Sequence, residues 1–509
     1  MTAPSETGAG GGTAFSAGYG DWEPDEFVAN GEAVLAFLSD YFTGIRDLPV
    51  SPTVDAKTLS AKIDTEVPQV GEEFTAILKD TQSLIVPYLT HWNHPRFHAY
   101  FSNTGSLPGV LADTVSSALN VNAMLWKSAP AASALEKTVL RWMADMLGIA
   151  SGSDGVLVNG AALATLYALT AARETVVGLD VRERGLTGYG RRLRLYTSDQ
   201  AHNSVDKAAI VLGIGLENVV HVPADDGYSM RGAALAAAIE ADLAAGHQPF
   251  AVVATVGTTA VAADDEIDAI ADVCRLHSLW LHVDAAYGGF WRVAGGGAEA
   301  AADLSRADSV VANPHKVLYA PMEVTALYCR HRDALPNVFR LVPEYLRTSP
   351  DDDVVDYMNY SPQLGRSFRA LKLWWIIRSF GVQGLARRLR RSIDMARWLR
   401  SAAGSDPDWQ VPVDSAYPLV CLRYVPRDLR RRYGSEPVPL ARIASLNADI
   451  LDAVNASGSA FLSHAVLRDG YVLRVSIGNI RTEPSDIETL WTQLRTSAAQ
   501  VWDGQWAHQ

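Results

Sequence analysis

From residue 155 onward, short apolar segments alternate with helical ones, and this alternation constrains the fold more than any other feature of the sequence. The apolar segments have the length of strands, and the segments between them carry apolar residues at helical spacing. We take as strands "GVLVNG" (155–160), "RLRLYTS" (192–198), "NVVHVP" (218–223), "FAVVATVGTT" (250–259), "LWLHVDAA" (279–286) and "SVVANPH" (309–315). Strands that alternate with helices form a buried, mostly parallel sheet, so the sequence predicts an α/β fold.

The rest of the chain divides by composition and pattern. Residues 1–20 are rich in Gly, Ser and Ala and are expected to form a disordered tail. Residues 21–95 have helical patterns, 96–385 contain the predicted sheet, and 386–509 combine Arg-rich helices with a few strands. The 509-residue chain is therefore expected to hold a helical N-terminal segment, a large domain and a small α+β C-terminal domain.

Charge and composition exclude several classes of function. A net charge of −13 and a pI near 5.4 argue against nucleic acid, because binding to a phosphate backbone needs a basic surface. No apolar stretch is long enough to span a membrane, and the first twenty residues lack the pattern of a signal peptide. Cys274, Cys329 and Cys421 show no paired spacing, which fits a reducing cytoplasm.

The residues that directly follow the predicted strands are the candidates for a site. In an open α/β sheet, ligands bind at the carboxyl ends of the strands. The segments at these ends are Gly160–Ala162, Asp199–His202, Gly257–Thr259, Asp284–Ala286 and Asn313–Lys316. Together they offer a helix start built from small residues, an imidazole, a carboxylate and a lysine.

Each candidate has an ordinary interpretation beside a chemical one. Lys316 is one of only eight lysines, and a lysine in a partly apolar setting can lose its proton and attack an aldehyde. Asp284 could pair with an arginine or with the ring nitrogen of a pyridine cofactor. The helix that begins after Gly160 could bind a phosphate or simply pack closely. Taken together, these groups favour pyridoxal phosphate as cofactor.

Longer motifs resemble one known family. "HVDAAYGGFW" (282–291) and "NPHK" (313–316) resemble the pyridoxal-phosphate-dependent group II amino-acid decarboxylases. "HWNHPRFHAYF" (91–101), "LGRSFRALKLWW" (364–375) and "SFGVQGL" (379–385) are similar to the aromatic L-amino-acid branch, which includes tryptophan, tyrosine and DOPA decarboxylases. The resemblance covers roughly residues 22–500. It implies fold type I (the aspartate-aminotransferase fold) and a homodimer with a shared active site, in which residues 21–95 form a dimerisation segment.

The resemblance also implies roles for individual residues. Lys316 would hold the cofactor as an imine, Asp284 would pair with its ring nitrogen, and His202 would stack on its ring. The residues beneath the ring and around the phosphate would be Gly160, Ala161, Ala162, Thr259, Ala286, Asn313 and His315. Residues 356–369 resemble a mobile loop that covers the neighbouring subunit's site, which points to Tyr357 as proton donor to the substrate α-carbon.

The residues expected near the substrate are Trp92, Tyr100, Phe101, Ser102, Asn122, Met124 and Gly381. Several positions depart from the family. Ala161 and Ala162 lack the usual hydroxyl, and Ser102 stands where a proline is usual. Asn122 and Met124, expected on a helix, replace apolar and Phe side chains, so an unpaired amide would favour a substrate with a polar group. Gly381 would leave room for an indole. The expected substrate is tryptophan or a substituted tryptophan, then tyrosine, DOPA or phenylalanine.

Three alternatives remain open. An oxidative, aldehyde-forming decarboxylase would use the same cofactor and similar substrates. His91, His94 and His98 could bind zinc from one helix face, although Pro95 makes an uninterrupted helix unfavourable there and no carboxylate or Cys completes the set, so no metal is expected. A non-catalytic interaction protein is the third, and the intact lysine, aspartate, histidine and tyrosine argue against it.

Overall fold

The computed structural model describes residues 21–63, 66–101, 103–295, 302–341 and 354–507. The predicted tail (residues 1–20) and Ser102 lie outside these ranges. The chain forms two compact units, Met1–Thr90 and His91–Gln509. No helix in the described part of the chain is both long enough and apolar enough to cross a membrane.

The first unit is helical, as the sequence predicts. Its longest helix is α1 (Pro24–Gly44), followed by α2 (Ala56–Ile63) and α3 (Phe74–Asp80), with short helical turns at Ile45–Asp47, Thr81–Ile85 and Val86–Tyr88. Trp22, just before α1, packs edge-on against Phe74 with 5.1 Å between ring centroids. None of the side chains of α1 is buried.

The second unit is built on the predicted sheet. Its described strands are ordered β1-β7-β6-β5-β4-β2-β3. They are β1 (Asp154–Val158), β2 (Leu193–Ser198), β3 (Val219–Val222), β4 (Gln248–Thr255), β5 (Trp280–Asp284), β6 (Ser309–Ala312) and β7 (Thr325–Cys329). Neighbouring strands from β3 to β6 are parallel, and β7 runs antiparallel to both β1 and β6. The mostly parallel sheet is confirmed. The strand–helix alternation does not reveal β7, because no full helix separates it from β6.

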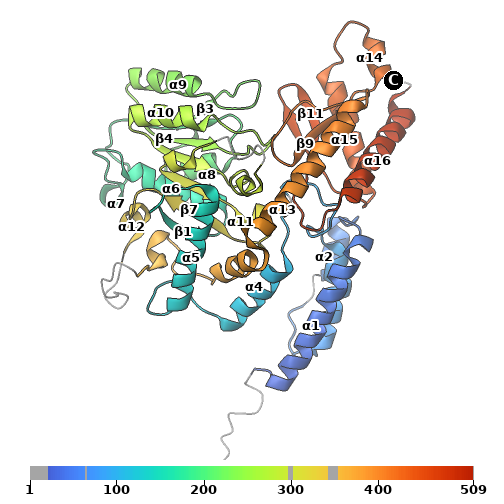
Figure 1. The fold of residues 1–509 in the computed structure, drawn as a ribbon, viewed down its shortest axis with the longest axis horizontal. Helices are drawn as coiled ribbons and strands as arrows, with labels where there is room; N and C mark the ends of the chain where they lie inside the picture. The colour runs from blue at the N-terminus through green and yellow to red at the C-terminus, as the bar shows by residue number, and fades with distance from the viewer. Residues whose placement is uncertain (1–20, 64–65, 102, 296–301, 342–353, 508–509) are drawn as a thin grey trace, which may run out of the picture. The chain divides into compact units, whose positions relative to one another are not determined.

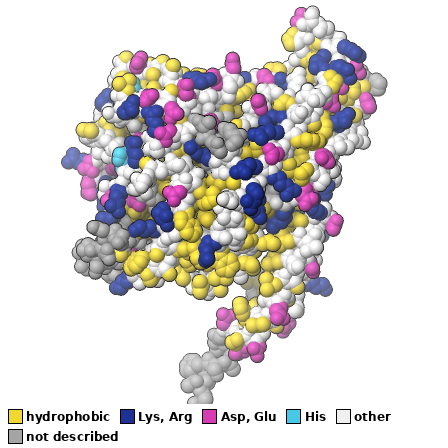
Figure 2. Space-filling model, viewed as in Figure 1, with side chains coloured by type: hydrophobic (Ala, Val, Ile, Leu, Met, Phe, Trp, Pro, Cys, Tyr) yellow, Lys and Arg dark blue, Asp and Glu magenta, His cyan; other side chains and the backbone are white. Residues whose placement is uncertain are grey.

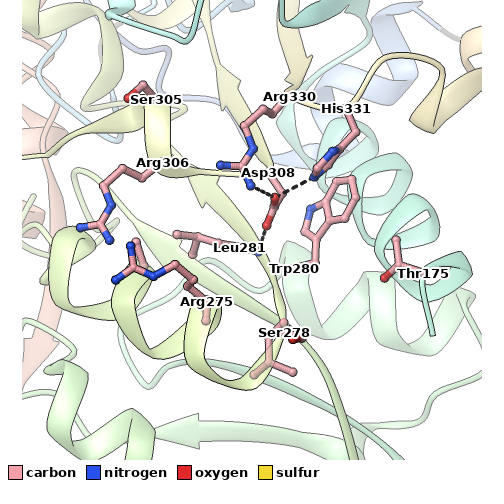
Figure 3. A pocket seen from close by; sticks show the side chains of 13 residues that line it. Thr175, Arg275, Ser278, Trp280, Leu281, Ser305, Arg306, Asp308, Arg330 and His331 are labelled. Atoms are coloured by element: carbon pink, nitrogen blue, oxygen red, sulfur yellow. Dashed lines mark hydrogen bonds and ion pairs between the residues drawn. The ribbon is translucent and has the colours of Figure 1, made fainter. Parts of the chain in front are cut away.

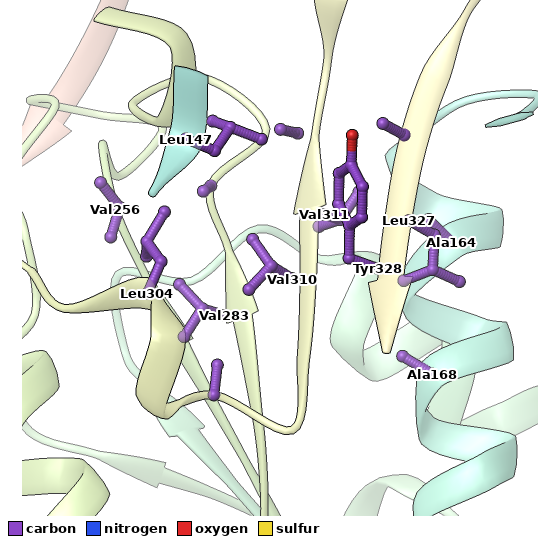
Figure 4. Packing of buried hydrophobic residues seen from close by; sticks show 14 of the residues in the cluster. Leu147, Ala164, Ala168, Val256, Val283, Leu304, Val310, Val311, Leu327 and Tyr328 are labelled. Atoms are coloured by element: carbon purple, nitrogen blue, oxygen red, sulfur yellow. The ribbon is translucent and has the colours of Figure 1, made fainter. Parts of the chain in front are cut away.

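Helices cover the sheet and enclose its core (Figure 1). They include α4 (Leu107–Leu119), α5 (Pro130–Leu147), α6 (Ala161–Glu174), α7 (Val181–Arg184), α8 (Ser204–Val211), α9 (Gly232–Ala244), α10 (Ile267–His277) and α12 (Ala334–Phe339). Figure 4 shows Val283, Val310 and Leu327 of the sheet within the same apolar cluster as Ala164 and Ala168 of α6. Small side chains on α6 let this helix approach the sheet closely, which fixes the position of its first turn.

A second, smaller sheet forms the C-terminal part. Its order is β10-β11-β9-β8, from β8 (Trp409–Gln410), β9 (Leu419–Tyr424), β10 (Ser463–Leu467) and β11 (Gly470–Ser476). It packs with α14 (Arg427–Tyr433), α15 (Leu440–Ala456) and α16 (Pro484–Val501) around its own apolar core. The long helix α13 (Ala370–Ser405) crosses the boundary expected at residue 385 and contributes to both cores.

Gly381 interrupts α13 with a backbone conformation that side chains disfavour. Its φ of 63° and ψ of 163° lie in a region used almost only by glycine. A Cβ built at this position meets no atom within 4 Å. The backbone therefore explains the glycine, and the expectation of room for an indole ring beside it stays a prediction.

We expect Gly381→Ala to lower the free energy of unfolding by about 1–3 kcal/mol, because alanine is strained at this φ and ψ. Gly404→Ala, near the end of the same helix and also without a neighbour within 4 Å of its Cβ, is the control and should be neutral or stabilising. Equilibrium unfolding in urea measures both. Equal stability of the two variants would contradict the argument.

His98 and His282 are fully buried. Burial lowers the pKa of each imidazole to about 4. The ring of His282, on β5, lies 2.8 Å from the Ser309 hydroxyl and 3.3 Å from that of Thr165. Both histidines are therefore neutral in the folded chain at pH values where an unfolded chain would protonate them.

We expect stability to fall as pH drops below about 6.5. The unfolded chain binds protons near pH 6.5 and the folded chain only near pH 4, so each histidine costs on the order of 2 kcal/mol by pH 5. Thermal unfolding between pH 7.5 and 5 measures the effect. An unchanged melting temperature over this range would show that the two rings already carry protons in the folded state.

Candidate active site

The predicted site segments lie along one edge of the sheet. Gly160–Ala162 follow β1, Asp199–His202 follow β2, Gly257–Thr259 follow β4 and Asn313–Lys316 follow β6, while Asp284 ends β5. Because β2, β4, β5 and β6 are parallel neighbours, their carboxyl ends meet at the same edge. The strand pattern in the sequence was therefore sufficient to bring these residues together.

Lys316 lies in α11 (Pro314–Val317), a single helical turn that begins directly after β6. Burial lowers the pKa of its ε-amine from the usual value, the Asp284 carboxylate acts in the opposite direction, and the Arg474 guanidinium lowers it further. A lowered pKa increases the neutral fraction of the amine, which is the form that attacks an aldehyde.

Asp284 is a buried carboxylate with 6% of its surface exposed. Its Oδ1 accepts a hydrogen bond from the backbone N–H of Ala286 at 3.0 Å. Among the residues that the structure describes, no arginine forms an ion pair with it. The interpretation of Asp284 as one half of a salt bridge with an arginine therefore does not hold for the described residues. A cationic ring nitrogen fits this carboxylate instead. Ala286 is buried beside it, as expected of a residue beneath a ring.

His202 presents an exposed imidazole at the same edge. Its Nδ1 accepts a hydrogen bond from the backbone N–H of Ser204 at 3.2 Å, which leaves the proton of the neutral ring on Nε2. Partial loss of solvent around the ring lowers its pKa, the Asp284 carboxylate raises it, and the ammonium groups of Lys316 and Lys207 lower it. The Asp284 carboxylate therefore favours the protonated forms of both His202 and Lys316.

The start of α6 fits a phosphate group. Gly160 precedes the helix with a φ of 92°, a conformation that favours glycine. Ala161 is half-buried and Ala162 exposed, so the first N–H groups of a 14-residue helix are screened only by methyl groups. Thr259, at the neighbouring strand end, is exposed as well. A lysine, an unpaired carboxylate and this helix start together match the groups of pyridoxal phosphate.

The side chains of Asn313 and His315 form hydrogen bonds with residues at the start of β7. The Asn313 Oδ1 accepts a hydrogen bond from the Thr325 hydroxyl at 2.7 Å. The Nδ1 of His315 lies 2.7 Å from the carbonyl oxygen of Val324, and burial lowers the pKa of its ring to about 4. These contacts hold the turn that carries Lys316 against β7. Their predicted part in binding the phosphate stays a prediction.

The aromatic segment before α4 places Phe101 at the lysine. The Phe101 ring stacks on Tyr287 with 3.7 Å between centroids, and the Lys316 Nζ lies 5.0 Å from its centre. Trp92 stacks on Tyr100 at 5.6 Å, and Tyr100 has a φ of 53°, which is uncommon for a non-glycine residue. The structure thus connects Phe101 directly to the site, with Trp92 and Tyr100 extending an aromatic surface from it.

Asn122 and Met124 do not lie on a helix. α4 ends at Leu119, because Asn120 adopts the left-handed conformation, and the following residues form turns. The Asn122 Oδ1 accepts a hydrogen bond from the backbone N–H of Arg366 at 3.0 Å, and its Nδ2 lies 3.4 Å from the Met124 sulfur. The expectation of an unpaired amide is wrong, so Asn122 gives no reason to require a polar substrate.

Tyr357 is buried within its own chain. Only 2% of its surface is exposed, and the Arg366 guanidinium lies 4.8 Å from its ring centre. Arg366 in turn forms a buried ion pair with Glu136 at 2.6 Å. The segment that carries Tyr357 is held by these contacts rather than lying loose over a site. The role of Tyr357 as proton donor stays a prediction.

Arg474 is a site residue that the sequence reading missed. This guanidinium on β11 is 4% exposed, lies 4.5 Å from the Phe101 ring and forms no ion pair with any carboxylate in the described residues. Its Nε donates to the Ala260 carbonyl at 3.1 Å and its Nη1 to that of Tyr100, while its Nη2 is buried without a partner in the described structure. The apolar strand "YVLRVSIG" is the signal that could have revealed it, because a charge inside a buried strand needs a counter-charge.

The histidines of the zinc alternative are buried but do not form a metal site. Residues 91–98 make turns, so His91, His94 and His98 do not share a helix face. Within the described ranges, no group of His, Cys, Asp or Glu side chains has the arrangement of a metal site. The geometry that the zinc alternative requires does not form.

Comparison with known proteins agrees with this geometry. Residues 57–425 match the family model described as the pyridoxal-dependent decarboxylase conserved domain. The aromatic-L-amino-acid decarboxylase of Rattus norvegicus and the phenylacetaldehyde synthase of a Rosa hybrid cultivar are each 34% identical over 94% of this chain, which covers 98% and 95% of their lengths. The TDC of Oryza sativa, solved with PLP and tryptamine, has a TM-score of 0.88 and 30% identity over 95% of this chain and 99% of that one.

The family match extends over most of the chain, and the site has the lysine, carboxylate and helix start that the cofactor requires. The chain belongs to the pyridoxal-dependent decarboxylase family, in its aromatic branch, and is an amino-acid decarboxylase that uses pyridoxal phosphate.

Proposed function

We propose that the protein converts an aromatic L-amino acid, tryptophan or a substituted tryptophan first, into the amine and carbon dioxide. The observation that carries this proposal is the position of Lys316, beside Asp284 and against the ring of Phe101. The presence of tryptamine, the amine of tryptophan, in the Oryza sativa structure supports the choice of substrate. Tyrosine, DOPA and phenylalanine rank next.

Each residue of the site would hold a different part of the cofactor. Lys316 would hold its aldehyde carbon, Asp284 its ring nitrogen, His202 one face of its ring and the start of α6 its phosphate. When bound, pyridoxal phosphate supplies an electron sink for the bond to the departing carboxylate. Asp284 would keep the ring nitrogen protonated, because its buried carboxylate forms no ion pair with an arginine among the described residues and favours a positive charge next to it.

The aromatic ring and the carboxylate of the substrate would meet different groups. Phe101, Tyr100 and Trp92 offer aromatic faces against which a flat substrate ring can pack. We infer that Arg474 binds the substrate carboxylate, since it is a buried cation beside Lys316 with an unused Nη2. A guanidinium without a counter-charge is a strong anion site in a medium of low dielectric constant.

The protein is further proposed to act as a homodimer with a shared active site. α4 exposes Leu107, Leu111, Val115 and Leu119, spaced by four residues and each 37–58% exposed. Figure 2 shows hydrophobic side chains gathered over the face around α4. A continuous apolar stripe of this kind is typical of a surface that a partner covers. The exposed apolar residues of α1, including Phe27 and Leu35, support the same proposal.

We infer a reducing compartment, the cytoplasm, from the cysteines. Cys274, Cys329 and Cys421 are all buried as free thiols. Burial raises the pKa of each thiol above its usual value, which keeps the sulfur atoms protonated and unreactive.

The direct test is reconstitution with pyridoxal phosphate, followed by assay of an amino-acid panel for amine release. We expect a visible absorbance band and amine formation with tryptophan or its derivatives ahead of tyrosine, DOPA and phenylalanine. Lys316→Ala should abolish both the band and turnover, whereas Lys207→Ala, at the same sheet edge but exposed, should keep both. A colourless protein after reconstitution would refute the proposal, and a coloured but inactive one would favour the non-catalytic alternative.

Arg474→Gln should raise KM for the amino acid about 10- to 100-fold, because one charge-assisted contact to the substrate carboxylate is lost. Binding of the product amine, which lacks the carboxylate, should change little. Arg423→Gln, on the adjacent strand β9 and paired with Asp469, serves as the control. Equal weakening of substrate and amine binding by Arg474→Gln would assign Arg474 a structural role.

The alternative reaction would give an aldehyde in place of the amine. The name of the Rosa relative, phenylacetaldehyde synthase, indicates such a product for that protein. If Tyr357 donates the proton, Tyr357→Phe assayed in the presence of dioxygen as the oxidant should keep the absorbance band and shift the products from amine toward aldehyde, ammonia and hydrogen peroxide. Tyr360→Phe, whose hydroxyl donates to Asp154 at 2.8 Å, is the matched control. Unchanged amine output from Tyr357→Phe would show that Tyr357 is not the proton donor and that its role is to pack against Arg366.

A further inference from the structure

A cavity of about 440 Å³ opens at the amino ends of β5 and β6, at the opposite end of these strands from Asp284 and Asn313 (Figure 3). The buried side chains of Trp280, Leu281 and Cys274 form an apolar part of its lining, called its floor below. Its size lies within the range of small-molecule sites in proteins. Trp280 begins β5 and Asp284 ends it, so the cavity and the catalytic edge are separated by the length of one short strand.

Hydrogen-bond donors dominate the rim of this cavity. Arg275 comes from the last turn of α10, Arg306 from the turn before β6, and Arg330 and His331 from the end of β7. In Figure 3 the guanidinium groups of Arg275 and Arg306 lie on one side, and Arg330 and His331 lie on the other beside Asp308. Several donors from separate elements thus converge on one space.

Asp308, the carboxylate in the lining, already accepts hydrogen bonds through both of its oxygens. Asp308 accepts hydrogen bonds from Arg330 and His331 through Oδ1 and from the backbone N–H of Leu281 through Oδ2. It therefore has little capacity to accept further donors from the rim.

The other two arginines are paired outside the lining. Arg275 and Arg306 each contact Asp272 through Nη2, and the Arg306 Nη1 donates to the Asp268 carbonyl oxygen and lies 3.7 Å from the Asp268 carboxylate. These contacts use one or two nitrogens of each group, and a guanidinium carries several N–H donors. The cavity consequently offers more donors than its own acceptors satisfy.

We propose that this cavity binds a small aryl anion, whose ring rests on the apolar floor near Trp280 and whose carboxylate or phosphate contacts the guanidinium rim. Arginine matches both carboxylate and phosphate, so either anion fulfils the chemistry. An aromatic body fits because the floor is apolar and Trp280 lies in it. The site is separate from Lys316 and does not depend on the proposed substrate.

Calorimetric titration of the holoenzyme with phenylacetate and phenyl phosphate tests the proposal, with 2-phenylethanol as the neutral probe. We expect at least one anion to bind and the alcohol to bind at least tenfold more weakly. Arg306→Gln and Arg330→Gln should each weaken anion binding about tenfold or more. Arg184→Gln, whose side chain is 83% exposed, should not.

Arg474→Gln separates this site from the active site, because an aryl carboxylate could also bind near Lys316. Binding that survives Arg474→Gln and is lost in Arg306→Gln supports the cavity. Absence of binding by both anions, or binding lost only in Arg474→Gln, overturns the proposal. Arg275→Gln provides a second rim variant if Arg330→Gln unfolds through loss of its pair with Asp308.

Discussion

The site depends on how one amine is held between opposite charges. Lys316 lies in a region that disfavours charge, with the Asp284 carboxylate on one strand end and the Arg474 guanidinium contributed by the smaller sheet. The carboxylate stabilises the protonated amine, while burial and the guanidinium favour the neutral one. A lysine in this balance can change its protonation state during a reaction cycle, which a solvent-exposed lysine does far less readily at neutral pH.

The two sheets contribute different parts of that balance. The large sheet supplies Lys316, Asp284 and His202 from the carboxyl ends of parallel strands. Because these ends lie side by side, the sheet itself brings the three residues close together. The small sheet supplies Arg474, which also fixes the aromatic segment through the Tyr100 carbonyl. Phe101 lies where the two contributions meet, with Tyr287 stacked on its ring and both cations near it. The packing of the two sheets against each other therefore sets the geometry of the site.

The sequence was most informative where local pattern determines structure. The alternation of strands and helices predicted the sheet, and the sheet placed Lys316, Asp284 and His202 at one edge. The place of Arg474 in the site could not be predicted, because the residues that it contacts are distant in the sequence. No local pattern indicates a contact between β11 and Phe101. The turn at Asn120 and the backbone of Gly381 were missed for another reason. Both depend on single dihedral angles that hydrophobic periodicity does not record.

The conformation of Gly381 makes α13 two rods joined at one residue. The rod that begins after Gly381 runs to Ser405 and carries side chains into the core of the small sheet. Its 24 residues, from 382 to 405, span roughly 36 Å, so a rotation of about 5° at Gly381 displaces the far end by about 3 Å. Arg474 lies on β11 of that small sheet, and its hydrogen bonds to the Ala260 and Tyr100 carbonyls oppose such a displacement. A single glycine thus sets the direction in which the second rod leaves the first, and with it the place of the apolar core that this rod supports.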